Sequence, residues 1–231
     1  MTHVLDAVLF DAGGVLVLPD PTVIAPLLAP YGGDPSLDRH CRAHYAAMAV
    51  KSTAGVGEAF WSEYDRAYVA SVGVDHHHRE HAAQLLNITR SAQLWRWPIP
   101  ASMSALAALA RQNVPMGVVS NASGQIEQEL LRSEICQVGE GIGIAMRCVI
   151  DSHVVGVAKP DPQIFEHALA YFPEFERERI GYVGDSVTMD IGGATAAGLY
   201  PVLLDPFDDH SDATFERIRS LHDLMPLVSR R

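Results

Sequence analysis

The stretch that decides the fold is Val4-Leu5-Asp6-Ala7-Val8-Leu9-Phe10-Asp11-Ala12-Gly13-Gly14-Val15-Leu16. An apolar run of strand length ends on one carboxylate, Asp11, and two glycines follow almost at once. Short runs rich in Val and Leu and bounded by glycine are typical of buried strands in parallel sheets. Because ligands bind outside the carboxyl ends of such strands, Asp11 is a candidate site residue. An ordinary strand-loop junction with Asp as a turn residue is the alternative interpretation, which the rest of the chain has to decide.

Beyond Pro100 the sequence alternates between strand and helix patterns. Strands are predicted at 115–119, 147–150, 180–183 and 200–204. Helices are predicted at 101–112, 124–132, 162–171 and 188–197, and an amphipathic helix is predicted from residue 213 onward. This alternation implies right-handed crossovers, and it predicts a doubly wound parallel α/β sheet.

Between about residues 22 and 92 the pattern is helical only, and four helices are predicted there. Apolar residues recur at helical spacing, as in Leu37, Cys41, Tyr45 and Met48. Prolines punctuate both ends of this region, near residues 19–21 and 98–100, as they would at a hinge. We therefore expect a Rossmann-like core of residues 1–18 and 95–231, and an inserted helical domain of residues 19–94 above the strand ends.

Composition limits the kinds of partner. The 231 residues carry a formal net charge of −11, which argues against nucleic acid or an anionic membrane as the main partner. Neither a secretory leader pattern nor an apolar stretch of membrane-spanning length is evident, so a cytoplasmic protein is expected. The three cysteines lack metal-ligand spacing and are interpreted as buried free thiols; they are Cys41, Cys136 and Cys148.

Three further strand ends carry polar side chains that could share a site with Asp11. Ser120 and Asn121 end one predicted strand ahead of a helix, where free backbone N–H groups can bind an anion, although a plain helix cap is the commoner use of such residues. Lys159 precedes Pro160 at a defined helix start, which fixes its position. A solvated surface lysine is the usual alternative.

The last of these strand ends supplies acidic groups. Asp185 ends a strand as Asp11 does, and Asp190 lies in the first turn of the next helix. The dipole of that helix would favour Asp190 in any case. Carboxylates from adjacent strand ends, with few other ligands, suit Mg²⁺, which also binds substrate phosphate and keeps several waters.

The ordered set Asp11, Ser120, Lys159, Asp185 and Asp190 resembles the motifs of the haloacid dehalogenase (HAD) superfamily of phosphatases and related hydrolases. The helical insert resembles the first-position cap of that superfamily. The likeness covers nearly the whole chain. It implies a hydrolase that acts on a small phosphorylated metabolite.

The resemblance also implies a role for each matching residue. Asp11 would be the nucleophile that forms an aspartyl-phosphate. Mg²⁺ would be held by Asp11, the backbone carbonyl of Gly13, and Asp185, with Asp190 bound directly or through water. The phosphoryl oxygens would be bound by Ser120 and the N–H of Asn121, and Lys159 would neutralise charge on nucleophile and phosphoryl group.

One position departs from the family pattern. Phosphatases of this superfamily usually carry a second Asp two residues after the nucleophile, as the general acid, and this chain has Gly13 there. A 2-haloacid dehalogenase also lacks that acid, so it remains an alternative, as does a phosphate-binding or regulatory protein without catalysis. Asp20 or a histidine of the cap could replace the acid.

Substrate-contacting residues of the cap are harder to predict. The candidates are Arg39, His40, Arg42, His44, Lys51 and Trp61. The cluster from His76 to His81 could suggest a metal site, but consecutive imidazoles on a helix face different ways, so we interpret it as a solvated helix start. We interpret the glycine-rich stretch at 139–143 as a loop.

Overall fold

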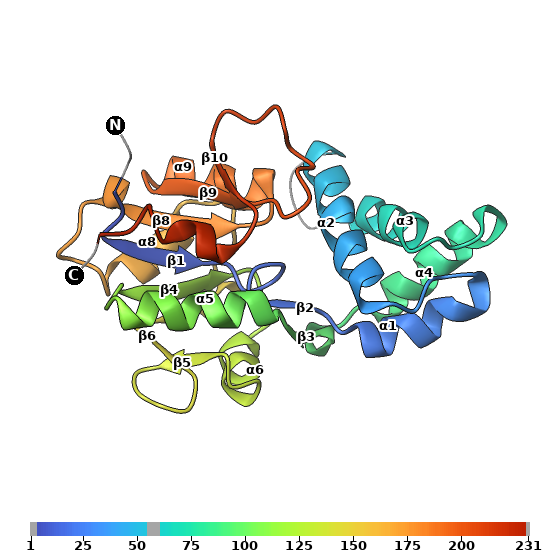
Figure 1. The fold of residues 1–231 in the computed structure, drawn as a ribbon, viewed down its shortest axis with the longest axis horizontal. Helices are drawn as coiled ribbons and strands as arrows, with labels where there is room; N and C mark the ends of the chain where they lie inside the picture. Colours follow the sequence, from blue (N-terminus) through green and yellow to red (C-terminus); the bar gives the residue numbers. More distant parts are fainter. Residues whose placement is uncertain (1–3, 55–60, 230–231) are drawn as a thin grey trace.

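In residues 4–54 and 61–229, which the computed structural model describes, the centre is a six-stranded parallel sheet in the order β10-β9-β8-β1-β4-β7 (Figure 1). The strands are β1 (Ala7–Phe10), β4 (Met116–Ser120), β7 (Val149–Asp151), β8 (Ile180–Gly184), β9 (Tyr200–Leu204) and β10 (Glu216–Ile218). The predicted doubly wound α/β fold is confirmed. The strand that carries the opening motif lies in the middle of the sheet, between β8 and β4.

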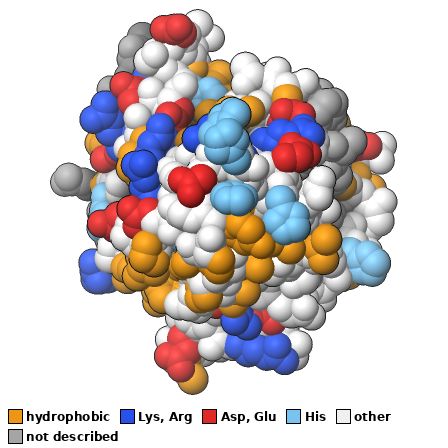
Figure 2. Space-filling view, turned by 90° about the vertical axis from the view of Figure 1, so that its right-hand side faces the viewer, with side chains coloured by type: hydrophobic (Ala, Val, Ile, Leu, Met, Phe, Trp, Pro, Cys, Tyr) orange, Lys and Arg blue, Asp and Glu red, His pale blue; other side chains and the backbone are white. Residues whose placement is uncertain are grey.

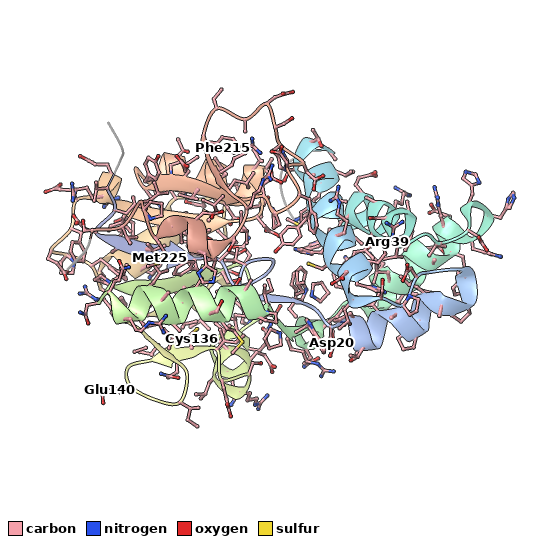
Figure 3. All side chains as sticks on the ribbon, viewed as in Figure 1. Asp20, Arg39, Cys136, Glu140, Phe215 and Met225 are labelled. Carbon is pink, nitrogen blue, oxygen red and sulfur yellow. The ribbon has the colours of Figure 1, made fainter. Side chains whose placement is uncertain are left out.

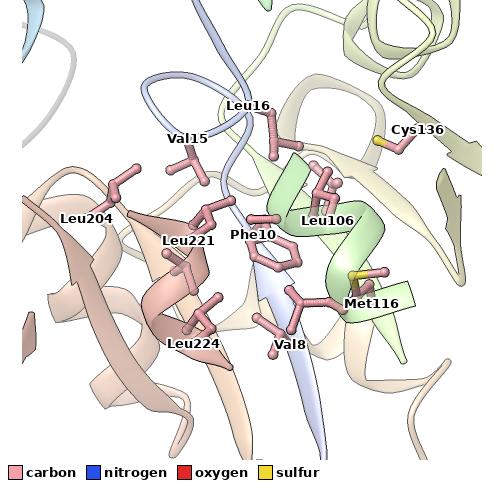
Figure 4. Close-up of a cluster of buried hydrophobic side chains, with 14 of the residues drawn as sticks. Val8, Phe10, Val15, Leu16, Leu106, Met116, Cys136, Leu204, Leu221 and Leu224 are labelled. Atoms are coloured by element: carbon pink, nitrogen blue, oxygen red, sulfur yellow. The ribbon is translucent and has the colours of Figure 1, made fainter. Parts of the chain in front are cut away.

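Alternate residues of β1 supply the two apolar layers on either side of the sheet. Val8 and Phe10 belong to the layer beneath α5 (Pro100–Arg111), which Figure 4 shows with Leu106 beside Phe10. Ala7 and Leu9 belong to the opposite layer, together with residues of α8 (Gln163–Leu169) and α9 (Gly192–Ala196). Because side chains alternate along a strand, a strand buried on both faces must be apolar throughout.

Shorter elements complete the part around the sheet. They are α6 (Ile126–Arg132), α7 (Ser152–Val155), the 3₁₀ helices η5 (Arg177–Arg179) and η7 (Leu221–Leu224), the π-helix η6 (Val187–Ile191), and the paired strands β5 (Cys136–Val138) and β6 (Ile144–Met146). Strands β5 and β6 were not predicted, but the glycine-rich stretch between them is the loop that the sequence indicates.

A separate group of helices lies beyond the carboxyl ends of the strands (Figure 1). It contains α1 (Pro21–Leu28), α2 (Leu37–Ala54), α3 (Trp61–Ser71) and α4 (Arg79–Thr89), with the 3₁₀ turns η1 (Ala29–Tyr31), η3 (His76–His78) and η4 (Ala92–Leu94). These helices, hereafter the helical insert, pack around an apolar cluster of their own that includes Ile24, Leu28, Ala47, Tyr68 and Leu86. The insert therefore has an apolar cluster distinct from the two layers that cover the sheet.

The two connections to the insert form one antiparallel ribbon rather than two loose proline-rich links. Strand β2 (Val17–Pro19) pairs with β3 (Trp95–Pro98). At the end of the ribbon, Asp20 caps α1 by accepting a hydrogen bond from the N–H of Thr22, and it forms an ion pair with Arg96 at 2.8 Å (Figure 3). Burial opposes ionisation of Asp20, but the bonds from Thr22 and Arg96 lower its pKa below the usual value.

The prediction of a final amphipathic helix from residue 213 onward is wrong. Residues Glu216–Ile218 instead add strand β10 to the edge of the sheet, beside β9, and a short 3₁₀ helix, η7, follows. The apolar spacing has a different origin. Ile218 lies on the strand and Leu221 and Leu224 lie on the 3₁₀ helix, and all three side chains are buried. The edge of a sheet has unpaired backbone N–H and C=O groups. Pairing with this edge stabilises the segment as a strand more than its local sequence favours a helix.

Two expectations from composition can be compared with the structure. Cys136 and Cys148 are buried free thiols, and burial raises the pKa of Cys136 to about 12, whereas Cys41 is only half-buried. Among the described residues, the helices are too short or too polar to cross a bilayer.

The revised tail gives a stability prediction. Leu224 is completely buried, so Leu224→Ala removes apolar contacts and leaves a cavity, and it should lower the free energy of unfolding by about 2–5 kcal/mol. Leu131→Ala is the control, because that leucine is 49% exposed and should change stability by less than about 0.5 kcal/mol. Urea denaturation measures both. Equal effects would contradict the packing described for the tail.

Candidate active site

Asp11 directly follows β1, at the carboxyl end of the sheet. Its Oδ1 accepts a hydrogen bond from the N–H of Ala12 at 2.7 Å and lies 3.0 Å from the Nζ atom of Lys159. The chain then turns sharply at Gly14, which has a φ of 71° that residues with a side chain rarely adopt. The side chain of Asp11 is 13% exposed, so a ligand can still reach it.

Lys159 is the buried cation at the centre of this site. Its Nζ donates to Oδ1 of Asp190 and to the hydroxyl of Tyr182, each at 2.7 Å, in addition to its contact with Asp11. Asn121 fixes the backbone of the lysine: its Oδ1 accepts from the N–H of Lys159, and its Nδ2 donates to the carbonyl of Lys159. Burial lowers the pKa of Lys159, but the carboxylates of Asp11 and Asp190 outweigh it and raise the pKa above its usual value.

Asp185 and Asp190 bring two more carboxylates to the same point. Asp185 follows β8, and Asp190 lies in η6, where its Oδ2 accepts a hydrogen bond from the N–H of Ser186. Asp11, Asp185 and Asp190 each have a potential ligand atom within 4.8 Å of those of the other two. Among the described residues, no other three Asp, Glu, His or Cys side chains come together in this way.

This acidic group fits a divalent cation. Oxygens bound to one Mg²⁺ at about 2.1 Å are at most about 4.2 Å apart, so small movements would bring the three carboxylates into contact with the ion. Burial and the neighbouring charges of Asp190 and Asp185 raise the pKa of Asp11 to about 7, although Lys159 opposes the shift. A bound divalent cation would stabilise these three carboxylates, because the single positive charge of Lys159 does not neutralise all of their negative charge.

A cavity of about 300 Å³ lies between the strand ends and the helical insert. All the predicted site residues line it: Asp11, Gly13, Ser120, Asn121, Lys159, Asp185 and Asp190. The opposite wall comes from the insert and the ribbon, and includes Met48, Lys51, Trp61, Arg90 and Trp95. Residues far apart in the sequence thus enclose a space large enough for a small metabolite.

Trp95 covers the position where the family's general acid would stand. A Cβ atom on Gly13 would lie 3.1 Å from Cζ3 of the indole, which is a tight contact. Asp20, which was predicted as a possible replacement for that acid, and His44, one of the histidines of the insert, have other partners. Asp20 caps α1 and pairs with Arg96, and the Nε2 atom of His44 lies 2.8 Å from Oδ2 of Asp185.

Of the substrate-contacting candidates predicted in the insert, Lys51 and Trp61 line the cavity. The others do not line it. Arg39 is exposed on the insert (Figure 3), Arg42 forms an ion pair with Asp209, and His40 is buried against the hydroxyl of Tyr68.

The consecutive histidines form the exposed 3₁₀ turn η3 at the start of α4. Figure 2 views the outer end of the insert, where several histidine side chains are visible on the surface. In the described residues these histidines do not form a group that could hold a metal, in agreement with the interpretation as a solvated helix start.

The structure adds three features that sequence reasoning missed. Tyr182 links Lys159 and Asp190 through its hydroxyl, the side chain of Asn121 holds the lysine backbone, and Trp95 covers Gly13. Tyr182 did leave a signal, because a hydroxyl in an otherwise apolar buried strand needs a partner. The other two are contacts across the fold that no local pattern shows.

Known proteins resemble this chain over half to most of its length. The family model for haloacid dehalogenase-like hydrolases matches residues 5–198. The pyrimidine 5′-nucleotidase YjjG of Escherichia coli is 28% identical over 80% of this chain and 84% of its own length. The phosphoserine phosphatase of Thermus thermophilus is 32% identical, over 48% of this chain and 42% of its own.

Solved structures resemble the fold. A HAD phosphatase from Thermococcus onnurineus superposes with a TM-score of 0.59 at 19% identity, covering 96% of this chain and 97% of that one. A dehalogenase with an intermediate complex gives 0.60 at 17% identity, with full coverage of both chains. Likeness at this level of identity shows the architecture alone.

The acidic group gives a prediction about Gly184. A Cβ atom there would lie 2.2 Å from Cγ of Asp190, so Gly184→Ala has to displace that carboxylate. We expect it to weaken binding of a divalent cation about 10- to 100-fold, which calorimetric titration with Mg²⁺ as the probe would measure. Gly192→Ala is the control, because its Cβ would meet nothing nearer than 3.7 Å. Equal affinities in both variants would show that Asp190 does not contribute to metal binding.

Proposed function

The chain belongs to the haloacid dehalogenase-like hydrolases, and on that premise we propose that it is a Mg²⁺-dependent phosphatase of a small phosphorylated metabolite. One observation carries the proposal: a ligand-accessible aspartate, a buried lysine and a compact acidic group line one cavity of metabolite size. Phosphoryl transfer needs this combination, because it depends on positioning and on neutralised phosphoryl oxygens.

In the proposed reaction Asp11 attacks phosphorus. The bond from phosphorus to the leaving oxygen breaks, that oxygen keeps the electron pair, and an aspartyl-phosphate forms on Asp11. Ser120 and the N–H of Asn121 bind phosphoryl oxygens, while Lys159 balances the charge on nucleophile and phosphoryl group. Water then attacks phosphorus, which releases phosphate and regenerates the carboxylate.

The metal site would be formed by Asp11, the carbonyl of Gly13, Asp185 and Asp190. When bound, Mg²⁺ supplies positive charge to the phosphoryl oxygens and to the nucleophile. Burial first, and then the charges of Asp190 and Asp185, raise the pKa of Asp11, so a cation held by these carboxylates would favour the ionised form of the nucleophile.

We propose that the helical insert, within residues 19–94, acts as a cap that encloses the substrate. Its wall of the cavity carries Lys51, Trp61 and Arg90, which face the part of the substrate that departs. The named relatives act on a nucleotide and on phosphoserine, which supports a small phosphorylated substrate. The magnesium-bound HAD-hydrolase YfnB of Bacillus subtilis, similar in fold at a TM-score of 0.58, is described as showing interdomain movement.

A second candidate is a 2-haloacid dehalogenase, in which Asp would attack carbon without a metal. The absence of an acid at Gly13 favours it. The acidic group favours the phosphatase instead, because Asp185 and Asp190 beside the nucleophile repel each other unless a cation binds. Retention of Asp11 and Lys159 in one site also argues against a protein that only binds phosphate.

The first test examines the nucleophile and the metal requirement in one assay. With an aryl phosphate, wild type should turn over with Mg²⁺, lose activity in excess chelator and regain it when Mg²⁺ is restored. Asp11→Asn should reduce the rate by at least about 1,000-fold, since the amide is a poor nucleophile, while the melting temperature stays close to that of wild type.

Several results would contradict the proposed function. Halide release from a 2-haloacid in excess chelator would establish the dehalogenase candidate. Phosphate binding without turnover of any ester would establish the non-catalytic one. Near wild-type activity of Asp11→Asn would exclude Asp11 as the nucleophile.

The second test concerns Gly13. Without an acid there, the departing oxygen takes its proton from water or from the substrate, so the rate should fall steeply as the pKa of the leaving alcohol or phenol rises. Gly13→Asp, made together with Trp95→Phe to clear the indole, should flatten this dependence and speed poor leaving groups by about 100-fold.

The control is Gly13→Asn in the same Trp95→Phe background, which fills the same space but cannot donate as an acid. Initial rates across a series of phosphate esters measure the slopes. A flat dependence in wild type would mean that another group already protonates the leaving oxygen.

A further inference from the structure

His44 crosses from the helical insert into the acidic group. It lies on α2, yet its Nε2 is 2.8 Å from Oδ2 of Asp185, and its side chain is only 1% exposed. The carboxylate can only accept, so the Nε2–H of His44 donates. This buried polar contact runs directly between the insert and the proposed metal ligands.

Tyr64 holds the imidazole in this orientation. The hydroxyl of Tyr64 lies 2.9 Å from Nδ1 of His44, and it can donate to that nitrogen or accept from it. The ring is also packed edge-on against Tyr45, Tyr64 and Trp95. The imidazole of His44 is therefore held by a hydrogen-bonding partner at each nitrogen and by aromatic rings around it.

The turn after the nucleophile is shaped to let the two groups meet. A Cβ atom on Gly14 would lie 1.8 Å from Oδ2 of Asp185 and 2.7 Å from Nε2 of His44. The next residue of α2, Tyr45, donates its hydroxyl hydrogen to the carbonyl of Gly14 at 2.7 Å. One helix of the insert therefore holds both the nucleophile turn and a metal carboxylate.

We propose that His44 is a positioning residue that fixes Asp185 for the metal. Metal binding then depends on the position that the insert has in this structure, with α2 in contact with Asp185, which we call the closed position. This inference rests on the proposed function, since it takes Asp185 as a metal ligand. Hydrogen bonds to a ligating carboxylate orient it, and their loss commonly weakens metal binding about 10- to 100-fold. By linkage, the metal must then favour the closed position to the same extent.

The chain offers a matched control one helical turn earlier. His40 lies on the same helix, is also buried, and makes the equivalent contact, 2.8 Å from its Nδ1 to the hydroxyl of Tyr68. Its Nε2 finds no partner among the described residues. His40→Leu thus removes a buried histidine-tyrosine pair without touching Asp185.

The experiment measures Mg²⁺ affinity by calorimetry and the radius of gyration by X-ray scattering, with and without Mg²⁺. His44→Leu should weaken Mg²⁺ binding about 10- to 100-fold and leave the protein more open, whereas His40→Leu should change neither quantity. His44→Gln, whose amide nitrogen can replace Nε2, should restore most of the affinity. Equal results for His44→Leu and His40→Leu would overturn the proposal.

A second pair covers the case in which His44→Leu does not fold. Tyr64→Phe frees the imidazole of His44, whereas Tyr68→Phe frees that of His40, at similar cost to packing. Only Tyr64→Phe should weaken Mg²⁺ binding; equal affinities would also overturn the proposal. If wild type itself binds no Mg²⁺, the proposed function fails rather than the role of His44.

Discussion

The balance of charge around Lys159 is the constraint on which the site depends. One buried ammonium contacts Asp11 and Asp190 directly, with Asp185 close by. Removing such groups from water costs several kcal/mol per ion, so each must be paired and hydrogen-bonded. The hydroxyl of Tyr182 and the N–H of Ser186 supply such bonds to the charged groups, and Asn121 holds the backbone of Lys159 in place. The sheet thus provides rigid anchors for charges that would otherwise repel one another.

The insert meets this charged centre through contacts of two kinds. Apolar and aromatic residues, such as Met48 and Trp61, line the far wall of the cavity, while His44 and Tyr45 reach the strand ends themselves. The ribbon formed by β2 and β3 carries both connections in one paired element. The same few residues therefore determine where the insert sits, how much space the substrate has, and how Asp185 is held.

The sequence predicts the sheet and the site residues because both follow short-range rules. Apolar runs that end on polar residues locate the strand ends, and the parallel sheet brings those ends together, so Asp11 and Asp185 could be expected to lie side by side. The tail could not be predicted, because Glu216–Ile218 becomes a strand only where β9 leaves an open edge. His44 was one of several candidates in the insert, and its contact with Asp185 depends on how α2 docks, which helical periodicity does not specify.

The indole of Trp95 over Gly13 has an evolutionary consequence. A side chain at position 13 would lie 3.1 Å from the ring, so the indole has to shift by a few tenths of an ångström before any such side chain fits. A smaller residue at position 95 would therefore ease the later arrival of a carboxylic acid at position 13. On the proposed mechanism, a chain with the indole in place would favour substrates whose departing group tolerates negative charge.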